Sequence, residues 1–201
     1  MMRISGERLF NLALGISFFF WAIDGLYESE KITFVRIGVS CLNGCVGFLL
    51  LFRADAIRFG NYKSILLALP SLILGGLIFS LSKDFVEWPI FTEIAFGVGL
   101  IITILSFISL GKSFSILPQV RKIVNGGMYR LIRHPAYLGE CTLLISCVIE
   151  STNPFYSIVA FVGYTPLIII RIRVEEKLLL SQVDYILYAD QTKWRLIPGI
   201  W

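Results

Sequence analysis

Six apolar stretches follow one another along the chain, and short polar segments separate them. They lie at residues 8–27, 33–52, 64–81, 90–110, 137–151 and 154–170. A helix needs about 20 consecutive apolar residues to cross the hydrocarbon core of a bilayer, so all but the short fifth stretch come close to that length. Asn153-Pro154 between the last two stretches predicts the tip of a tight helical hairpin. The pattern therefore predicts an all-α, polytopic membrane helix bundle with five or six transmembrane helices.

The composition supports a membrane protein. Hydrophobic residues make up 56% of the chain and charged residues 16%, with a mean hydropathy of +0.78. An ordinary soluble domain of this length is less apolar and more highly charged. The first stretch follows basic residues as a signal peptide does, but Asp24-Gly25-Leu26 offers no small-residue cleavage site, so we interpret it as a retained helix.

Basic residues are distributed unevenly between the two sides of the predicted bundle. Fifteen of the eighteen fall at the ends of the stretches that would lie on one side: Arg3, Arg8, Arg53, Arg58, Lys63, Lys112, Arg121, Lys122, Arg130, Arg133, Arg171, Arg173, Lys177, Lys193 and Arg195. Lys31, Arg36 and Lys83 fall on the other side. Because cytoplasmic loops carry the excess of Lys and Arg, we expect both termini and the loop before the fifth stretch in the cytoplasm. Anionic lipid explains the net charge of +4, which therefore indicates no nucleic-acid partner.

Polar chemistry is concentrated where that loop meets the fifth stretch. The segment from Gly126 to Glu140 places the only histidine, His134, directly before Pro135. Proline is favoured at the first position of a helix, so His134 is predicted to be the N-cap of a helix whose free N–H groups face the same place. Such a terminus suits a carboxylate, a phosphate or the polar end of a cofactor. The alternative is a turn at the membrane surface whose arginines only touch lipid headgroups.

A second polar group follows the sixth stretch. Arg171 and Glu175 lie one helical turn apart and share a face. The predicted hairpin returns Arg171 to the same membrane surface as His134, where its guanidinium can hold a carboxylate bidentately. The alternative is an arginine snorkelling to the interface beside a solvated acidic pair. Further on, Tyr185, Tyr188 and residues 194–201 are interpreted as a lid over the site or as aromatic anchors in the interface.

Several common sites are not predicted. All four cysteines, Cys41, Cys45, Cys141 and Cys147, lie in apolar stretches, and no C-x-x-C pair occurs. With a single histidine and no dense carboxylate cluster, we predict no metal site. The chain also has neither a G-x-G-x-x-G motif nor a P-loop, so a Rossmann or P-loop nucleotide site is not supported.

A series of motifs in the last ninety residues resembles a known family. In order, the motifs are Gly111-Lys112-Ser113-Phe114-Ser115, Gln119, Gly127-Met128-Tyr129, Arg133-His134-Pro135-Ala136-Tyr137, Arg171-x-Arg173-x-Glu175-Glu176, Tyr185-x-x-Tyr188 and Arg195-Leu196-Ile197-Pro198. Over roughly residues 111 to 201 they resemble the isoprenylcysteine carboxyl methyltransferases and their prokaryotic relatives. The resemblance implies an integral-membrane methyltransferase that uses S-adenosyl-L-methionine without a Rossmann fold. Residues 1–110 would be scaffold helices, and residues 111–201 would build a cytoplasmic cofactor pocket.

The resemblance also implies roles for individual residues. It places Arg171 at the methyl acceptor, as the catalytic residue, and places around the cofactor Gln119, Arg121, Lys122, Ile123, Val124, Tyr129, His134, Pro135, Ala136, Tyr137 and Glu175. Methyl transfer from a sulfonium is mainly a matter of alignment and exclusion of water. An ionised carboxylate acceptor needs no general base, whereas an amine acceptor must first lose a proton. His134 is therefore interpreted as a cofactor-holding group, with a role as catalytic base as the alternative.

The acceptor is the part of the function that the sequence leaves most open. We favour a hydrophobic, lipid-like acceptor with a prenylcysteine-type carboxylate, drawn from the membrane lipids around the protein. A phospholipid amine and a hydrophobic thiol are the alternatives. The non-enzymatic alternative is a small membrane transporter or scaffold, which would carry its functional charges within the helices rather than at one end. The sequence does not determine the oligomeric state.

Overall fold

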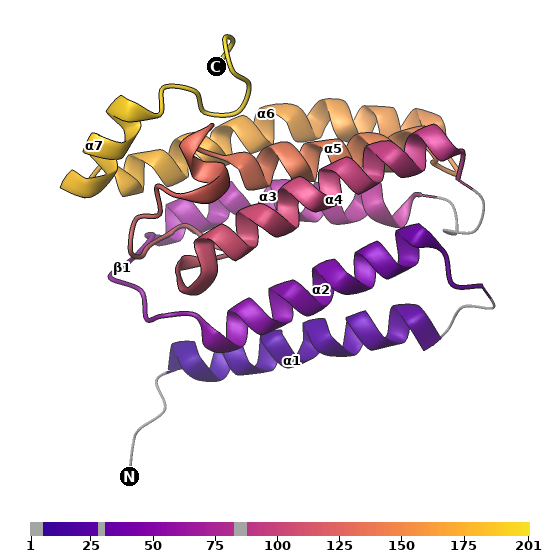
Figure 1. Ribbon diagram of the computed structural model, residues 1–201, viewed down its shortest axis with the longest axis horizontal. Helices are drawn as coiled ribbons and strands as arrows, with labels where there is room; N and C mark the ends of the chain where they lie inside the picture. Colours follow the sequence, from indigo (N-terminus) through magenta and orange to yellow (C-terminus); the bar gives the residue numbers. More distant parts are fainter. Residues whose placement is uncertain (1–5, 28–30, 83–87) are drawn as a thin grey trace.

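The computed structural model describes residues 6–27, 31–82 and 88–201 (Figure 1). Two of the basic residues used to predict the topology, Arg3 and Lys83, lie outside these ranges. The helices are α1 (Gly6–Tyr27), α2 (Phe34–Phe52), α3 (Tyr62–Ser80), α4 (Ile90–Leu110), α5 (Pro135–Ile149), α6 (Pro154–Leu179) and α7 (Val183–Gln191). Two short 3-10 helices, η1 (Gly111–Ser113) and η2 (Gly127–Arg130), lie in the loop between α4 and α5.

The helical interpretation of the apolar stretches is confirmed. Within the described ranges, α1, α2, α3, α4 and α6 are long and apolar enough to span a membrane, whereas α5 is a shorter apolar helix. Large apolar side chains such as Phe20, Ile73 and Val162 are exposed on the outside of the bundle. Exposure of such residues is costly in water and favourable in lipid. The chain is therefore a multi-pass membrane protein of the all-α class.

Local sequence signals set where several helices begin. The Thr33 and Asn61 side chains accept hydrogen bonds from the backbone of Arg36 and Ser64, and so cap α2 and α3. The Asn153 side chain caps α6 in the same way, with Pro154 at the first helical position. The predicted hairpin between α5 and α6 is confirmed, because only four residues, 150–153, join the two helices. Helix α6 runs on past residue 170 to Leu179 and so carries the Arg171 segment as a direct continuation of its membrane part.

Helices α4 and α5 pack with their backbones close together. A Cβ atom added to Gly99 would lie 2.8 Å from the Leu143 nitrogen, and one added to Gly139 would lie 2.8 Å from the Gly99 carbonyl oxygen. Only glycine fits at such a contact. This packing holds the N-terminus of α5, and with it the His134 segment, against the end of α4.

A small antiparallel pairing was not predicted from the sequence. Strand β1 (Arg58–Phe59), between α2 and α3, pairs with β2 (Gln119–Val120), in the loop after α4. Hydrogen bonds from Ile57 N to Val120 O, 2.8 Å long, and from Gly60 N to Pro118 O, 3.0 Å long, extend the pairing on both sides. The long loop after α4 is thereby tied to the first half of the chain.

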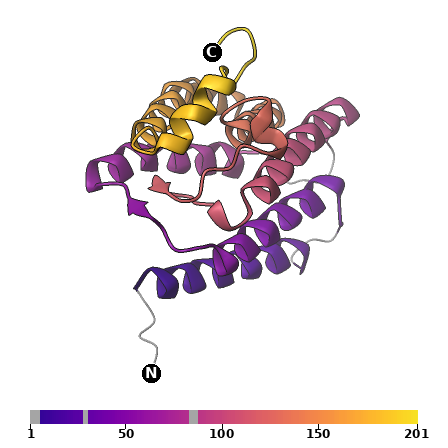
Figure 2. The same ribbon diagram turned by 60° about the vertical axis from the view of Figure 1, so that its left-hand side comes forward.

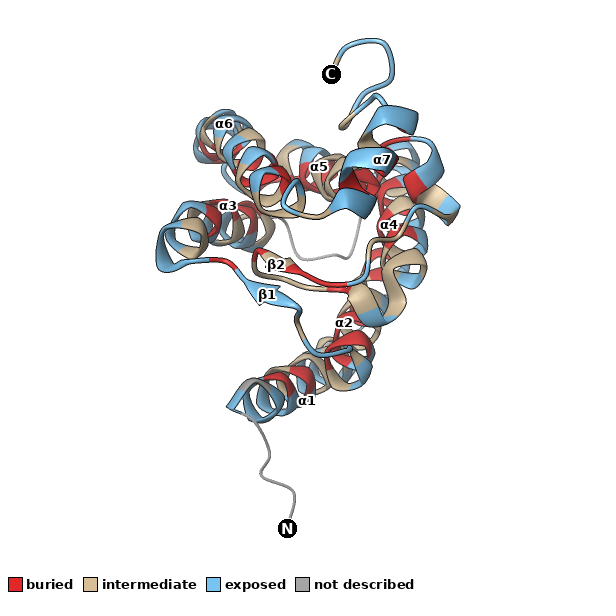
Figure 3. Ribbon diagram, turned by 90° about the vertical axis from the view of Figure 1, so that its left-hand side faces the viewer, coloured by how far each residue is buried: buried red, intermediate tan, exposed pale blue. Residues whose placement is uncertain are grey.

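The bundle has two parts that lie side by side (Figure 2). Helices α3, α4, α5 and α6, together with Val35 of α2, share the largest buried core, which contains Phe96, Leu144 and Tyr164. Helix α1 pairs with α2 along one flank (Figure 1). The strands, α7 and the start of α5 gather at one end of the bundle (Figure 3). The polar motifs of the sequence therefore meet at that end, which we call the loop end.

Candidate active site

A polar pocket of about 270 Å³ lies at the loop end, between the long loop, α5, α6 and α7. Eleven of the twelve residues assigned to the site from the sequence line it: Gln119, Arg121, Lys122, Ile123, Val124, Tyr129, His134, Ala136, Tyr137, Arg171 and Glu175. The twelfth, Pro135, is fully buried at the first position of α5 and does not line the pocket. Side chains up to 56 positions apart in the sequence, from Gln119 to Glu175, are thus brought together, as expected for antiparallel helices that return to the same end.

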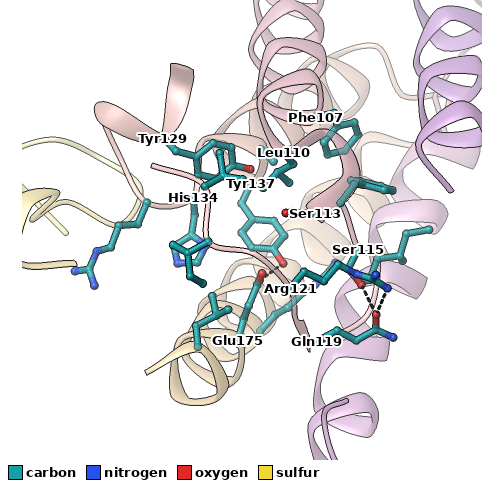
Figure 4. A pocket seen from close by; sticks show the side chains of 18 of the residues that line it. Phe107, Leu110, Ser113, Ser115, Gln119, Arg121, Tyr129, His134, Tyr137 and Glu175 are labelled. Atoms are coloured by element: carbon teal, nitrogen blue, oxygen red, sulfur yellow. Dashed lines mark hydrogen bonds between the residues drawn. The ribbon is translucent and has the colours of Figure 1, made fainter. Parts of the chain in front are cut away.

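Tyr137 and Glu175 form the polar link between α5 and α6 in the pocket wall. The Tyr137 hydroxyl donates a hydrogen bond of 2.7 Å to Glu175 Oε2 (Figure 4). The Arg171 guanidinium lies over the Tyr137 ring, 5.0 Å from its centroid. A tyrosine between a carboxylate and a guanidinium is held in one orientation by both. The wall is therefore fixed before any ligand binds.

Arg171 is buried rather than extended to the membrane surface. Its side chain is 5% exposed, with Nη2 donating to the Ile116 carbonyl oxygen at 2.8 Å and Nη1 to Ser71 Oγ at 3.4 Å. These contacts join α6 to α3 and to the long loop. The guanidinium thus holds the pocket wall in place and also faces its interior.

His134 is the N-cap residue of α5, as predicted, but its side chain makes no capping hydrogen bond. Its Nε2 instead lies 3.3 Å from Glu176 Oε1, and its ring stacks on Tyr137 at 5.7 Å between centroids. Glu176 also accepts from Arg133 Nη1 at 2.9 Å and from Arg195 Nε at 2.6 Å. A buried carboxylate with three basic partners is well compensated. Glu176 therefore positions His134 from behind the pocket.

The segment after α7 lies against the His134 loop. Backbone hydrogen bonds of 2.8 Å run from Arg133 N to Trp194 O and from His134 N to Arg195 O. Leu196 and Trp201 pack against the main core. This segment was interpreted as a lid or as an interface anchor, and its backbone pairs with the loop that carries His134.

Three tyrosines form one buried wall of the pocket. Tyr129, Tyr185 and Tyr188 pack together, and the Tyr188 hydroxyl donates to the Tyr129 carbonyl oxygen at 2.8 Å. Burial raises the pKa of Tyr129 well above its usual value, and the nearby Glu175 carboxylate raises it further. Burial also raises the pKa of Tyr185 and of Tyr188. All three hydroxyls therefore stay uncharged and present aromatic surface with neutral polar tips.

The long loop closes the pocket on the side of the strands. Gln119 Oε1 accepts from Arg121 Nη2 at 2.7 Å and from Ser115 Oγ at 3.2 Å (Figure 4). Ser113 Oγ donates to the Lys122 carbonyl oxygen at 2.8 Å. These bonds give the loop a fixed shape, with polar groups facing inward.

A second cavity of about 540 Å³ adjoins the polar pocket within the bundle. Five helices, α1 to α5, line this apolar cavity, and most of its lining is aliphatic or aromatic. Five residues line both the apolar cavity and the polar pocket: Phe18, Val46, Leu72, Phe107 and Glu140. The two spaces are therefore neighbours, with a carboxylate at their junction.

Glu140 was not singled out from the sequence. The signal that could have found it is a carboxylate inside an apolar stretch, three residues after Tyr137 and so on the same helix face. An ionisable residue within a membrane helix is a functional candidate by default. Tyr185 and Tyr188 were seen in the sequence, but their place in the pocket wall was not assigned.

The lining of the polar pocket fits S-adenosyl-L-methionine. Its volume is close to the lower end of the range of about 300 to 1,000 Å³ that is usual for small-molecule sites. Glu175 can accept from an ammonium or from ribose hydroxyls, and the three tyrosines offer aromatic surface for a nucleobase. The chemistry of the lining thus suits a molecule that is part nucleoside and part amino acid.

Comparison with known proteins gives one family match. A family model described as phospholipid methyltransferase matches residues 89–182. This range runs from the start of α4 to just past the end of α6. It includes the residues of α4, the long loop, α5 and α6 that line the polar pocket. No curated protein matches the chain. The match indicates a membrane methyltransferase that acts on lipid-like substrates. The resemblance inferred from the motifs is thereby confirmed. Over these residues the chain is similar to the phospholipid methyltransferases, which are one family of the isoprenylcysteine carboxyl methyltransferase-like membrane methyltransferases.

Proposed function

We propose that the protein transfers a methyl group from S-adenosyl-L-methionine to the polar end of a lipid-like acceptor. The observation that carries this proposal is the contact between the two spaces: a polar pocket and a larger apolar cavity share five lining residues. A methyl donor bound in the polar pocket would meet an acceptor whose hydrocarbon part lies in the apolar cavity, at the place where the two spaces join. Bringing two reactants together in this way supplies much of the catalysis of a transfer reaction.

The residues of the polar pocket would hold the donor. S-adenosyl-L-methionine supplies a methyl group on a sulfonium sulfur. Glu175 would accept hydrogen bonds from its polar groups, and Tyr129, Tyr185 and Tyr188 would enclose its aromatic part. His134, fixed by Glu176, would face the same ligand. The buried tyrosine wall would exclude water from the transferred methyl group.

The acceptor would reach the apolar cavity sideways from the bilayer. Trp21 of α1 and Gly76 of α3 both line the cavity and are both exposed on the outside of the bundle. A Cβ atom added to Gly76 would meet no atom within 4 Å. We place the opening between α1 and α3, on the flank where the α1–α2 pair lies beside the main core (Figure 3).

Two acceptor classes fit this arrangement differently. A prenylcysteine-type carboxylate, favoured by the motif resemblance, would be held by Arg171. That guanidinium already donates to Ile116 and Ser71, and the one charged residue among the described residues that line both cavities, Glu140, opposes an anion at their junction. An amine would meet that carboxylate favourably. The geometry therefore supports a phospholipid amine better, in agreement with the family that matches residues 89–182.

We also propose that the loop end faces the cytoplasm. Basic residues of the polar segments gather at the end of the bundle that carries the polar pocket, among them Arg58, Lys112 and Arg133, whereas Lys31 lies between α1 and α2 at the other end. A cytoplasmic excess of Lys and Arg is the usual bias in membrane proteins. The donor would then enter from the cytoplasm and the acceptor from the membrane.

The test is methyl transfer from labelled S-adenosyl-L-methionine by the detergent-purified protein to a panel of three acceptors: phosphatidylethanolamine, a prenylcysteine analogue and a hydrophobic thiol. Titration with S-adenosylhomocysteine measures donor-site binding separately. We expect binding of S-adenosylhomocysteine and transfer to the amine lipid. A parent protein that neither binds S-adenosylhomocysteine nor methylates any acceptor contradicts the proposal and supports the transporter or scaffold alternative.

A further inference from the structure

Glu140 occupies a position that neither the motif resemblance nor the family match explains. It lies in the second turn of α5 and lines both the polar pocket and the apolar cavity. Across from it on α3, a Cβ atom added to Gly75 would lie 3.6 Å from Glu140 Oε1. Because Gly75 has no side chain of its own, it leaves room beside the carboxylate, bordered by Leu144 and Tyr164, and neighbouring Gly76 has no atom within 4 Å of an added Cβ. The carboxylate faces open volume on the acceptor side of the site.

The titratable and charged groups around Glu140 come from two helices. Helix α6 presents Arg171 and Tyr164, and α5 itself presents Tyr137 and Cys141. Tyr164 is fully buried and Arg171 is 5% exposed. Arg171 is the one cation in this set, and it is shared with the Ile116 carbonyl oxygen. A carboxylate in such an environment is costly to keep ionised unless a further cation binds beside it.

We propose that Glu140 binds the amino group of the methyl acceptor at the junction of the two cavities and takes up the proton that this group must lose. This inference rests on the proposed function. An ammonium has no lone pair, so it cannot attack a methyl group until it is deprotonated. Transfer of one N–H proton to a Glu140 oxygen leaves a neutral amine beside the donor site.

The step balances in atoms and electrons. The nitrogen lone pair forms the new bond to the methyl carbon, and the electron pair of the broken carbon–sulfur bond stays on sulfur. The product amine becomes a methylated ammonium, and the donor becomes a neutral thioether. The proton on Glu140 leaves through the polar pocket to water, so one proton is released for each methyl group transferred.

A purely structural role for Glu140 makes a different prediction. In that case the carboxylate only balances the charge of Arg171, and its loss disturbs donor and acceptor binding together, for every acceptor. Recognition of an amine instead gives a loss that depends on the chemistry of the acceptor. The choice of acceptor therefore separates the two roles.

The experiment compares the parent, Glu140→Gln and Glu140→Asp in detergent. Equilibrium binding of short-chain phosphatidylethanolamine, of the prenylcysteine analogue and of S-adenosylhomocysteine is measured for each, with the two acceptors tested in the absence of the methyl donor. For Glu140→Gln we expect amine-lipid affinity to fall about tenfold or more, because an ion-pair contact is lost. Binding of S-adenosylhomocysteine and of the prenylcysteine analogue should stay within about twofold of the parent. Glu140→Asp keeps the charge and should recover part of the lost affinity.

Glu93→Gln is the matched control. Glu93 lies in the first turn of α4 and lines neither cavity, so the same chemical change there should leave all three affinities unchanged. Unchanged amine-lipid binding by Glu140→Gln would overturn the inference, as would an equal loss of all three ligands. A parent that methylates only the prenylcysteine analogue would also overturn it while leaving methyl transfer itself intact. A parent that fails to bind S-adenosylhomocysteine would instead count against the proposed function.

Discussion

The hydroxyl of Tyr137 donates a 2.7 Å hydrogen bond to Glu175 Oε2 and so joins the first turn of α5 to the last part of α6. The two residues come from motifs 38 positions apart. Both side chains line the polar pocket, and the Arg171 guanidinium lies over the Tyr137 ring. This link makes the donor side of the site a rigid wall. It also separates the role of Glu175 from that of Glu176, which lies behind the wall.

Replacement of Glu175 by glutamine should weaken donor-site binding. The substitution removes a charged acceptor from the polar pocket, worth about 1 to 3 kcal/mol when buried, or about five- to a hundredfold in affinity. Titration calorimetry with S-adenosylhomocysteine measures the effect. The exposed Asp190 of α7 gives a control, Asp190→Asn, that should bind like the parent. Equal affinities for parent and Glu175→Gln would remove Glu175 from the donor site.

Replacement of Glu176 by glutamine should lower the thermal stability of the protein more than it lowers ligand affinity. Glu176 is buried and holds Arg133, His134 and Arg195 together. Loss of its charge weakens these contacts, at about 1.5 to 3 kcal/mol for a hydrogen bond to a charged group. Thermal unfolding in detergent should show a lower midpoint than for Glu175→Gln. A midpoint equal to that of the parent would show that the three basic residues are held by other contacts.

Replacement of Gly76 by leucine should hinder the acceptor without affecting the donor. The added side chain would enter the mouth of the apolar cavity, so the KM for a lipid acceptor should rise several-fold while S-adenosylhomocysteine affinity stays the same. Gly44→Leu is the control, because Gly44 also has open space around it and lines neither cavity. If both variants behave like the parent, the acceptor takes another route.

Replacement of Arg171 by lysine keeps the charge but loses the forked donor geometry. Its contacts to Ile116 and Ser71 would be broken, so methyl transfer should fall sharply, whereas S-adenosylhomocysteine affinity should fall by less because Tyr137 stays hydrogen-bonded to Glu175. The exposed Arg173 on the same helix supplies the comparison Arg173→Lys, which should retain activity. Transfer by Arg171→Lys at the parental rate on every acceptor would exclude Arg171 from the acceptor side.

The orientation in the membrane can be tested by cysteine labelling in intact cells. In a background without the four native cysteines, Ser181→Cys at the loop end should be protected from a membrane-impermeant reagent, and Thr152→Cys at the other end should react. Both positions are exposed and lie just beyond opposite ends of α6. The reverse pattern of labelling would place the loop end outside the cytoplasm.

The sequence was sufficient for the helices and for most of the polar pocket. Long apolar stretches must be helical in a bilayer, since every backbone N–H and carbonyl group needs a partner within its own segment. Antiparallel helices then return His134 and Arg171 to the same end of the bundle. The small sheet was not predictable in this way, because Arg58–Phe59 and Gln119–Val120 are two-residue strands in separate loops and carry no pattern of their own.

Glu175 and Glu176 show most clearly what only the tertiary structure decided. The sequence placed an acidic pair at the end of an apolar helix, and one helical residue rotates the side-chain direction by about 100°. Which carboxylate faces the pocket depends on the rotation of α6 against α3 and α5, and that rotation is set by packing of side chains from all three helices. The same packing places Glu140 between the polar pocket and an apolar cavity that five helices enclose together. Such a position depends on contacts distant in sequence, so no local pattern determines it.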